Sequence, residues 1–202
     1  MDQGQRAAID RILGEAIDVL TTVRGGDLEP VARAAEAIAE AFGNGQALLV
    51  FGNGGSASDA QHFVTEFVGR YQRERRAVPA LALTADSSLL TAVANDYGFE
   101  RVFVRQIEAL GRPGDVAFGI STSGKSPSVL KALDAARAQG LTTVALTGHD
   151  GGPIGAAAQI HINVPAASTP RVQEVHGTLI HAICELVERT LETESGKRGT
   201  GR

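Results

Sequence analysis

The fold of this chain is decided by the stretch Asp115-Val116-Ala117-Phe118-Gly119-Ile120-Ser121-Thr122-Ser123-Gly124-Lys125-Ser126-Pro127. The first six residues form a mainly apolar run, the next six are small and polar, and Pro127 marks the first turn of a helix that Gly140 closes. A short apolar run bounded by turn residues predicts a buried strand. The stretch therefore predicts a strand, a polar loop and a helix in succession.

The same arrangement recurs at four other apolar runs that end in small polar residues, namely 47–51, 80–83, 142–146 and 160–164. Helical spacing follows several of them, and the last helix is expected from Pro170 to about Leu191. Apolar strands alternating with helices are typical of a parallel sheet covered on both faces. We therefore expect an α/β fold with a doubly wound, five-stranded parallel sheet. In such a sheet, ligands bind beyond the carboxyl ends of the strands.

The first 45 residues differ from this pattern, because apolar residues at helical spacing predict two helices there, separated by Gly25-Gly26. We therefore expect three parts: an N-terminal helical pair over 1–45, the α/β domain over 46–192 and a flexible tail over 193–202.

Composition excludes several classes of protein. The chain has 202 residues, of which 43% are hydrophobic and 4% aromatic, and it carries a net charge of −4. This charge disfavours a nucleic-acid-binding face, and the single cysteine excludes a disulfide framework. No apolar run approaches the roughly 20 residues of a membrane span, and the polar N-terminus is unlike a signal peptide, so we expect a cytoplasmic protein that binds neither membranes nor nucleic acid.

Two loops, 52–56 and 121–126, are candidates for binding an anion. The glycines of 52–56 would let backbone N–H groups approach an anion, although a tight turn with Ser56 as helix cap is the better explanation of a single glycine-rich turn. The loop 121–126 is more informative, because its four hydroxyls exceed what one cap requires, and hydroxyls beside a helix N-terminus bind phosphate. Residues 119–126 also match the P-loop pattern. A nucleotide triphosphatase is the poorer interpretation, because Pro127 starts the helix after Ser126 and no acid ends the run 142–146.

Two helices carry candidate chemistry. His62 and Glu66 are four residues apart, so they share one helix face and could bind a divalent metal or transfer a proton; the alternative is a solvated pair. On the last helix, Gln173 and His181 lie roughly 80° apart around the axis and could converge on one site. Spacing alone does not choose between His181 and His176.

The order of motifs resembles the sugar isomerase (SIS) superfamily and, within it, the phosphoheptose isomerases. The resemblance covers roughly residues 5–192 and rests on five segments, namely 52–56, 59–63, 95–99, 119–124 and 173–176. It implies a flavodoxin-like α/β sandwich whose N-terminal helices pack on the domain and in a homotetramer, with active sites at the subunit interfaces. The sequence departs from the family pattern at Lys125, which either adds charge near a phosphate or points to solvent, and at Pro170, where some members have Asp.

The resemblance also implies roles for individual residues. Glu66 and His181 match the acid/base pair, and one zinc ion per subunit would be held by His62, Glu66, Gln173 and His181. The substrate-binding set, which includes Glu66 and Gln173, would further comprise Asn53, Gly54, Gly55, Ser56, Asn95, Asp96, Ser121, Thr122, Ser123 and Ser126. From the residues alone, Asn95 and Asp96 could serve polyol hydroxyls or simply form a turn.

The reaction implied is the conversion of sedoheptulose 7-phosphate to D-glycero-D-manno-heptose 7-phosphate through an enediol. A carboxylate that binds zinc is a weaker base, so either one oxygen of Glu66 stays free or its two roles alternate. The alternative function is a non-catalytic SIS-fold protein that senses a sugar phosphate or binds the bacterial replication initiator. His181 favours catalysis, because the initiator-binding relatives resemble the enzyme less at that position.

Overall fold

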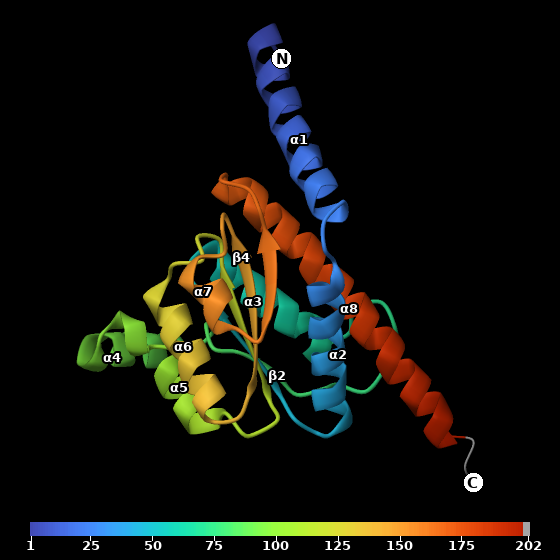
Figure 1. Cartoon of the computed structure of the whole chain (residues 1–202), viewed down its shortest axis with the longest axis vertical. Coiled ribbons are helices and arrows are strands. Elements are labelled where there is room, and N and C mark those ends of the chain that lie inside the picture. The colour runs from blue at the N-terminus through green and yellow to red at the C-terminus, as the bar shows by residue number, and fades with distance from the viewer. Residues whose placement is uncertain (200–202) are drawn as a thin grey trace.

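The computed structural model describes the backbone of residues 1–199 and the side chains of residues 1–193. Five strands alternate with helices along the chain (Figure 1). In chain order, the elements are α1 (Gln3–Arg24), α2 (Glu29–Gly43), β1 (Leu48–Gly52), α3 (Gly55–Val68), β2 (Ala80–Ala82), α4 (Ser87–Tyr97), η1 (Phe99–Arg101), α5 (Val104–Leu110), β3 (Val116–Ser121), α6 (Pro127–Ala138), β4 (Thr142–Gly148), α7 (Gly152–Ala157), β5 (Ile160–Val164) and α8 (Thr169–Gly199).

The five strands form one parallel sheet in the order β2-β1-β3-β4-β5, which confirms the predicted fold class. β2 pairs with one edge of β1, and β3 pairs with the opposite edge of β1, so β1 and β3 are neighbours in the sheet. In a doubly wound sheet, the two loops that leave such a pair diverge to opposite faces and leave a crevice between them. The loops after Gly52 and Ser121 are the two that border this crevice.

Helices cover both faces of the sheet because both faces are apolar. Alternate residues of the strands, such as Val50 and Phe118, pack against α2, α3 and α8, whereas Phe51 and Ala117 pack with α5 and α6 on the opposite face. Figure 1 shows the same division, with α2 and α8 on one side of the sheet and α4 to α7 on the other. Two-sided burial explains why the strands appear as continuous apolar runs in the sequence.

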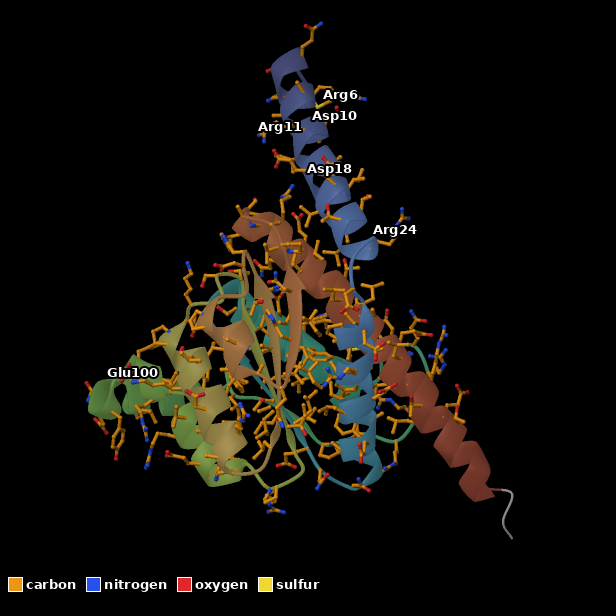
Figure 2. The ribbon with its side chains drawn as sticks, viewed as in Figure 1. Arg6, Asp10, Arg11, Asp18, Arg24 and Glu100 are labelled. Atoms are coloured by element: carbon orange, nitrogen blue, oxygen red, sulfur yellow. The ribbon has the colours of Figure 1, made fainter. Side chains whose placement is uncertain are left out.

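The first helix behaves differently from the second. α2 buries an apolar stripe that includes Ile38 and Phe42, whereas α1 has no buried residue and projects beyond the α/β body (Figure 1). Figure 2 shows its charged side chains, including Arg6 and Asp18, spread along this projecting helix. Near its end, Val19 and Val23 pack against the core, but most apolar positions of α1 are exposed, namely Ile9, Ile12, Leu13, Ile17 and Leu20.

Helix ends and short helices depart from the sequence-based expectation. The helical backbone of α8 continues to Gly199, beyond the predicted end near Leu191, so most of the tail expected to be flexible is helical; residues 200–202 lie outside the described part. The apolar face ends at Leu191, but helix hydrogen bonds are local and need no core contact to continue. The short helices η1, α5 and α7 were not expected, because they have too few turns to show a helical period. Within the described residues, no helix combines the length and apolarity needed to cross a membrane.

The substitution Gly119→Ala should reveal how tightly the centre of the sheet is packed. A Cβ at this position of β3 would lie 2.9 Å from Val129 Cγ1 and 3.2 Å from Phe51 Cε2, so we expect a loss of about 1–3 kcal/mol of unfolding free energy in urea. Gly177→Ala is the matched control, because a Cβ there meets nothing within 4 Å in a helix and should stabilise slightly. Equal effects of the two substitutions would contradict this packing.

Candidate active site

The loop after β3 gathers hydroxyl groups at the start of α6. Ser121 Oγ lies 3.3 Å from Ser126 Oγ and 3.5 Å from Ser123 Oγ, while Ser126 is the N-cap residue and makes no side-chain cap hydrogen bond. The first N–H groups of a helix lack intrahelical partners and lie at the positive end of its dipole. Hydroxyls and N–H groups together therefore form a donor cluster suited to an anion such as phosphate. Thr122 belongs to the same loop, and the side chain of Lys125 is exposed.

The loop after β1 lies against this cluster and against α8. Asn53 Nδ2 donates to Ser128 Oγ at 2.9 Å, which ties the loop to α6. Gly54 has φ +56 and is the N-cap of α3 without a side-chain cap, so the helix-cap interpretation of this loop is wrong; Ser56 is buried instead. A Cβ on Gly55 would lie 2.3 Å from Gln173 Nε2, so glycine leaves room for the amide end of this side chain in its present position.

Three predicted site residues meet where α3 crosses α8. His62 Nε2 lies 2.8 Å from His181 Nε2 and 3.5 Å from Glu66 Oε1. The side chain of Glu66 is 16% exposed, whereas that of His62 is 50% exposed, so the cluster has a covered side and an open side. Helical spacing brings Glu66 to His62, but only the crossing of the two helices brings His181, which is 119 residues away from His62 in the chain.

The cluster fits a divalent metal. One potential ligand atom from each of His62, Glu66 and His181 lies within 4.8 Å of the other two. Two imidazoles and one carboxylate are a donor set of catalytic zinc sites, which keep a further position for water or substrate. Gln173 is adjacent, because its Nε2 makes long hydrogen bonds of 3.4–3.5 Å to the carboxylate of Asp59, one turn before His62. Burial raises the pKa of Asp59, although the hydrogen bond from Gln173 and the charge of His62 oppose this shift.

His176 lies outside the cluster. Its side chain is fully buried, Nε2 donates to the Thr147 carbonyl at 2.9 Å, and Nδ1 has no partner. Burial lowers the pKa of His176 to about 4, opposed by the hydrogen bond to Thr147. The position of α8 thus separates the two histidines that spacing alone could not distinguish, with His176 toward the core and His181 toward α3.

Asn95 and Asp96 stand apart from the other predicted residues. Both are exposed at the end of α4, where Asn95 Nδ2 donates to Asp96 Oδ1 at 2.8 Å. Figure 1 shows α4 at the far side of the sheet from α8. Within one chain, therefore, they do not lie beside the cluster formed by His62, Glu66 and His181.

Sequence reasoning missed the surroundings of His181. The Tyr71 ring stacks on the His181 ring, with 5.5 Å between centroids and 23° between planes. Tyr71 lies in the irregular segment after α3, which binds the buried carboxylate of Glu188. The sequence carried one signal for these surroundings: Glu188 follows His181 by seven positions and therefore lies on the same helix face.

Comparison with known proteins agrees with this arrangement. The family model described as SIS domain matches residues 13–148. A phosphoheptose isomerase from Geotalea daltonii is 57% identical over 83% of this chain and 88% of its own, and one from Roseiflexus sp. is 51% identical over 96% and 98%. The chain belongs to the phosphoheptose isomerase family. Among solved structures, the phosphoheptose isomerase from Neisseria gonorrhoeae is 42% identical, with a TM-score of 0.87 over 92% of this chain and 99% of its own.

Membership of the phosphoheptose isomerases makes this chain an isomerase, and therefore an enzyme. The high coverage in both directions means that the relatives match the N-terminal helices as well as the sheet. The crevice between β1 and β3, with the cluster beside it, is accordingly the candidate active site of this isomerase.

Lowering the pH should destabilise the fold through His176. The pKa of His176 is lowered to about 4 from an ordinary 6.5, so between these values the unfolded chain binds a proton that the folded chain does not. We expect this residue to account for a loss of about 3 kcal/mol of unfolding free energy between pH 7 and pH 4.

Urea unfolding of the wild type and His176→Gln at both pH values measures the effect, because Gln keeps a donor and does not titrate. The variant should lose less unfolding free energy on acidification. Equal losses in the two proteins would contradict the assignment.

Proposed function

We propose that this enzyme interconverts sedoheptulose 7-phosphate and D-glycero-D-manno-heptose 7-phosphate. The observation that carries the proposal is the meeting of Glu66 with His181, a carboxylate and an imidazole, on two helices that both reach the glycine loop. Asn53 ties that loop to α6, whose start carries the donor cluster suited to phosphate. Membership of the phosphoheptose isomerases supports the choice of a heptose phosphate.

The phosphate would bind at the start of α6. The hydroxyls of Ser121, Thr122, Ser123 and Ser126 would donate to its oxygens, together with the free N–H groups of the helix. The loop of Asn53, Gly54, Gly55 and Ser56 would line the same pocket, since it is already tied to α6 through Ser128. Anchoring this end positions carbons 1 and 2 for the reaction.

Isomerisation moves one proton between carbons 1 and 2 and a second between their oxygens. In our proposal, Glu66 transfers the proton at one carbon and His181 at the other, so that an enediol forms and collapses. The proton gained by one oxygen and the proton lost by the other return both residues to their starting states. The covered position of Glu66 limits exchange of that proton with water.

His62, Glu66 and His181 would hold a zinc ion, with Gln173 as the proposed fourth ligand. When bound, zinc would act as a Lewis acid toward the substrate oxygens and stabilise their developing negative charge. The donor set supports this proposal through its chemistry, since two imidazoles and a carboxylate are a donor set of catalytic zinc sites, and zinc coordination can expand to five when a further oxygen binds.

We propose a homotetramer with active sites at subunit interfaces, located in the cytoplasm. The projecting helix α1 supports self-association, because its exposed apolar positions, which include Ile12 and Ile17, are not covered by any described part of the chain. In such an assembly, Asn95 and Asp96 would contact a sugar held in the site of a neighbouring copy.

The substitution Glu66→Gln should abolish turnover while the protein still folds. The amide keeps the shape of the side chain but accepts no proton, so we expect a loss of roughly a hundredfold or more in kcat. Purified protein is incubated with sedoheptulose 7-phosphate, with added zinc or with chelator, and aldose formation is followed. Glu108→Gln, which changes a surface carboxylate bound to Arg101, serves as the control.

The same assay, combined with binding measurements on the wild type, separates the rival functions. Binding of the sugar phosphate without conversion would indicate a sensor, and tight magnesium-dependent binding of a nucleotide would indicate a P-loop protein. Near-normal turnover by Glu66→Gln would refute the acid/base assignment.

The substitution Ser123→Ala should weaken substrate binding more than catalysis. Loss of one hydrogen bond to a charged phosphate is expected to raise KM about tenfold, with kcat changed little. Steady-state kinetics on the sugar phosphate measure both constants. Thr190→Ala removes a hydroxyl that bonds only within α8 and should leave KM unchanged; an unchanged KM in Ser123→Ala would count against this loop as the phosphate anchor.

A further inference from the structure

The segment that follows α3 is held by one buried carboxylate. Residues 69–76, here called the strap, have no regular secondary structure. Glu188 Oε1 accepts from the N–H of Tyr71 at 3.0 Å, and Oε2 accepts from the N–H groups of Gln72 at 3.1 Å and Arg73 at 3.0 Å. Three consecutive N–H groups thus converge on a side chain that is fully buried.

Arg75 connects this carboxylate to the end of α3. Its Nε donates to Glu188 Oε1 at 3.2 Å, while Nη2 donates to the Glu66 carbonyl at 2.6 Å and Nη1 to the Phe67 carbonyl at 2.9 Å. These carbonyls lie in the last turn of the helix, where they lack intrahelical partners. One guanidinium therefore links the backbone of Glu66 to α8.

The strap also covers His181. Its Tyr71 ring stacks on the imidazole, and the Tyr71 N–H is one of the three that Glu188 holds. Glu188 follows His181 by seven residues, which is two helical turns on the same face. The carboxylate thus reaches both partners of the proposed acid/base pair, through Arg75 to Glu66 and through Tyr71 to His181.

The charge of Glu188 is essential to this arrangement. Burial alone would raise the pKa of the carboxyl, but the three N–H groups and Arg75 outweigh burial and lower the pKa below its ordinary value. A charged carboxylate accepts all four donors at once, whereas a neutral amide offers one oxygen and adds two donors of its own.

We propose that Glu188 is a positioning residue of this enzyme: through the strap it sets the orientation of the His181 ring and the place of Glu66, a role that rests on the isomerase function proposed above. The orientation of a proton-transfer group affects the chemical step, whereas the strap bonds to α3 and α8 and not to the loop proposed as the phosphate anchor. Loss of the contacts made by Glu188 therefore lowers kcat, since misplacement of a reacting group slows the chemical step roughly 10–100-fold. KM for the sugar phosphate stays within about twofold of the wild-type value.

Glu188→Gln is compared with Glu185→Gln to test this role. Glu185 lies one turn earlier on α8 and pairs with Arg73 and Arg189 through their side chains, but it does not bind the strap backbone or Arg75. We expect a 10–100-fold loss of kcat in Glu188→Gln and a kcat near that of the wild type in Glu185→Gln. Circular dichroism verifies that both variants fold.

A second pair of variants tests the ring contact without disturbing the buried carboxylate. Tyr71→Ala removes the stack and should lower kcat about tenfold, whereas Tyr71→Phe keeps the ring and should restore it. If Glu188→Gln does not fold, this pair alone tests whether the strap orients the His181 ring. A Tyr71→Ala variant with the kcat of the wild type would overturn the proposal.

The ring protons of His181 provide a readout that does not depend on activity. In chelator-treated protein with labelled histidine, the stacked Tyr71 ring shifts these resonances, which a His181→Gln variant assigns. We expect Glu188→Gln to move them toward their position in Tyr71→Ala and Glu185→Gln to leave them unmoved. Unchanged resonances and unchanged kcat in Glu188→Gln would overturn this inference alone; a wild type without isomerase activity would overturn the proposed function, and this inference with it.

Discussion

The adjacency of β1 and β3 is the constraint on which the rest of the structure depends. After β1 the chain adds β2 on one side, and it then adds β3, β4 and β5 on the other side. The helices that follow β1 and β3, namely α3 and α6, therefore start at one crevice but lie on opposite faces of the sheet. The hydroxyl loop at α6 and the glycine loop at α3 meet there through Asn53 and Ser128. Each loop alone supplies only part of the proposed anion site.

Helix α8 supplies the rest of the site because it packs beside α3 on the same face of the sheet. Its apolar side, with Val175 and Ile183, is buried in the core, and this orientation aims His181 at His62. Gly55 lets the amide of Gln173 on α8 lie directly against the start of α3, since a Cβ there would displace that amide. The glycine of this loop thus gives room to the Gln173 side chain as well as backbone access for an anion.

Two buried polar groups on α8 illustrate opposite solutions to the cost of burial. His176 stays neutral, with one nitrogen bonded to the Thr147 carbonyl and a lowered pKa. Glu188 stays charged because its donors outweigh the cost of burial. His176 anchors α8 to β4 of the sheet, and Glu188 anchors the strap to α8. The same helix is therefore bonded both to the sheet and to the segment that contacts His181.

The sequence by itself determined the α/β class, the five strands and the loops that carry the hydroxyls and glycines, because apolar periodicity and turn residues are local signals. It also determined that His62 and Glu66 share a face, since helical geometry requires it. Only the tertiary structure decided that His181 rather than His176 joins them, that Asn95 and Asp96 lie across the sheet, and that Tyr71 and Glu188 surround the imidazole. These outcomes depend on how helices pack over a sheet, and the contacts responsible join residues more than 100 positions apart, such as Tyr71 and Glu188.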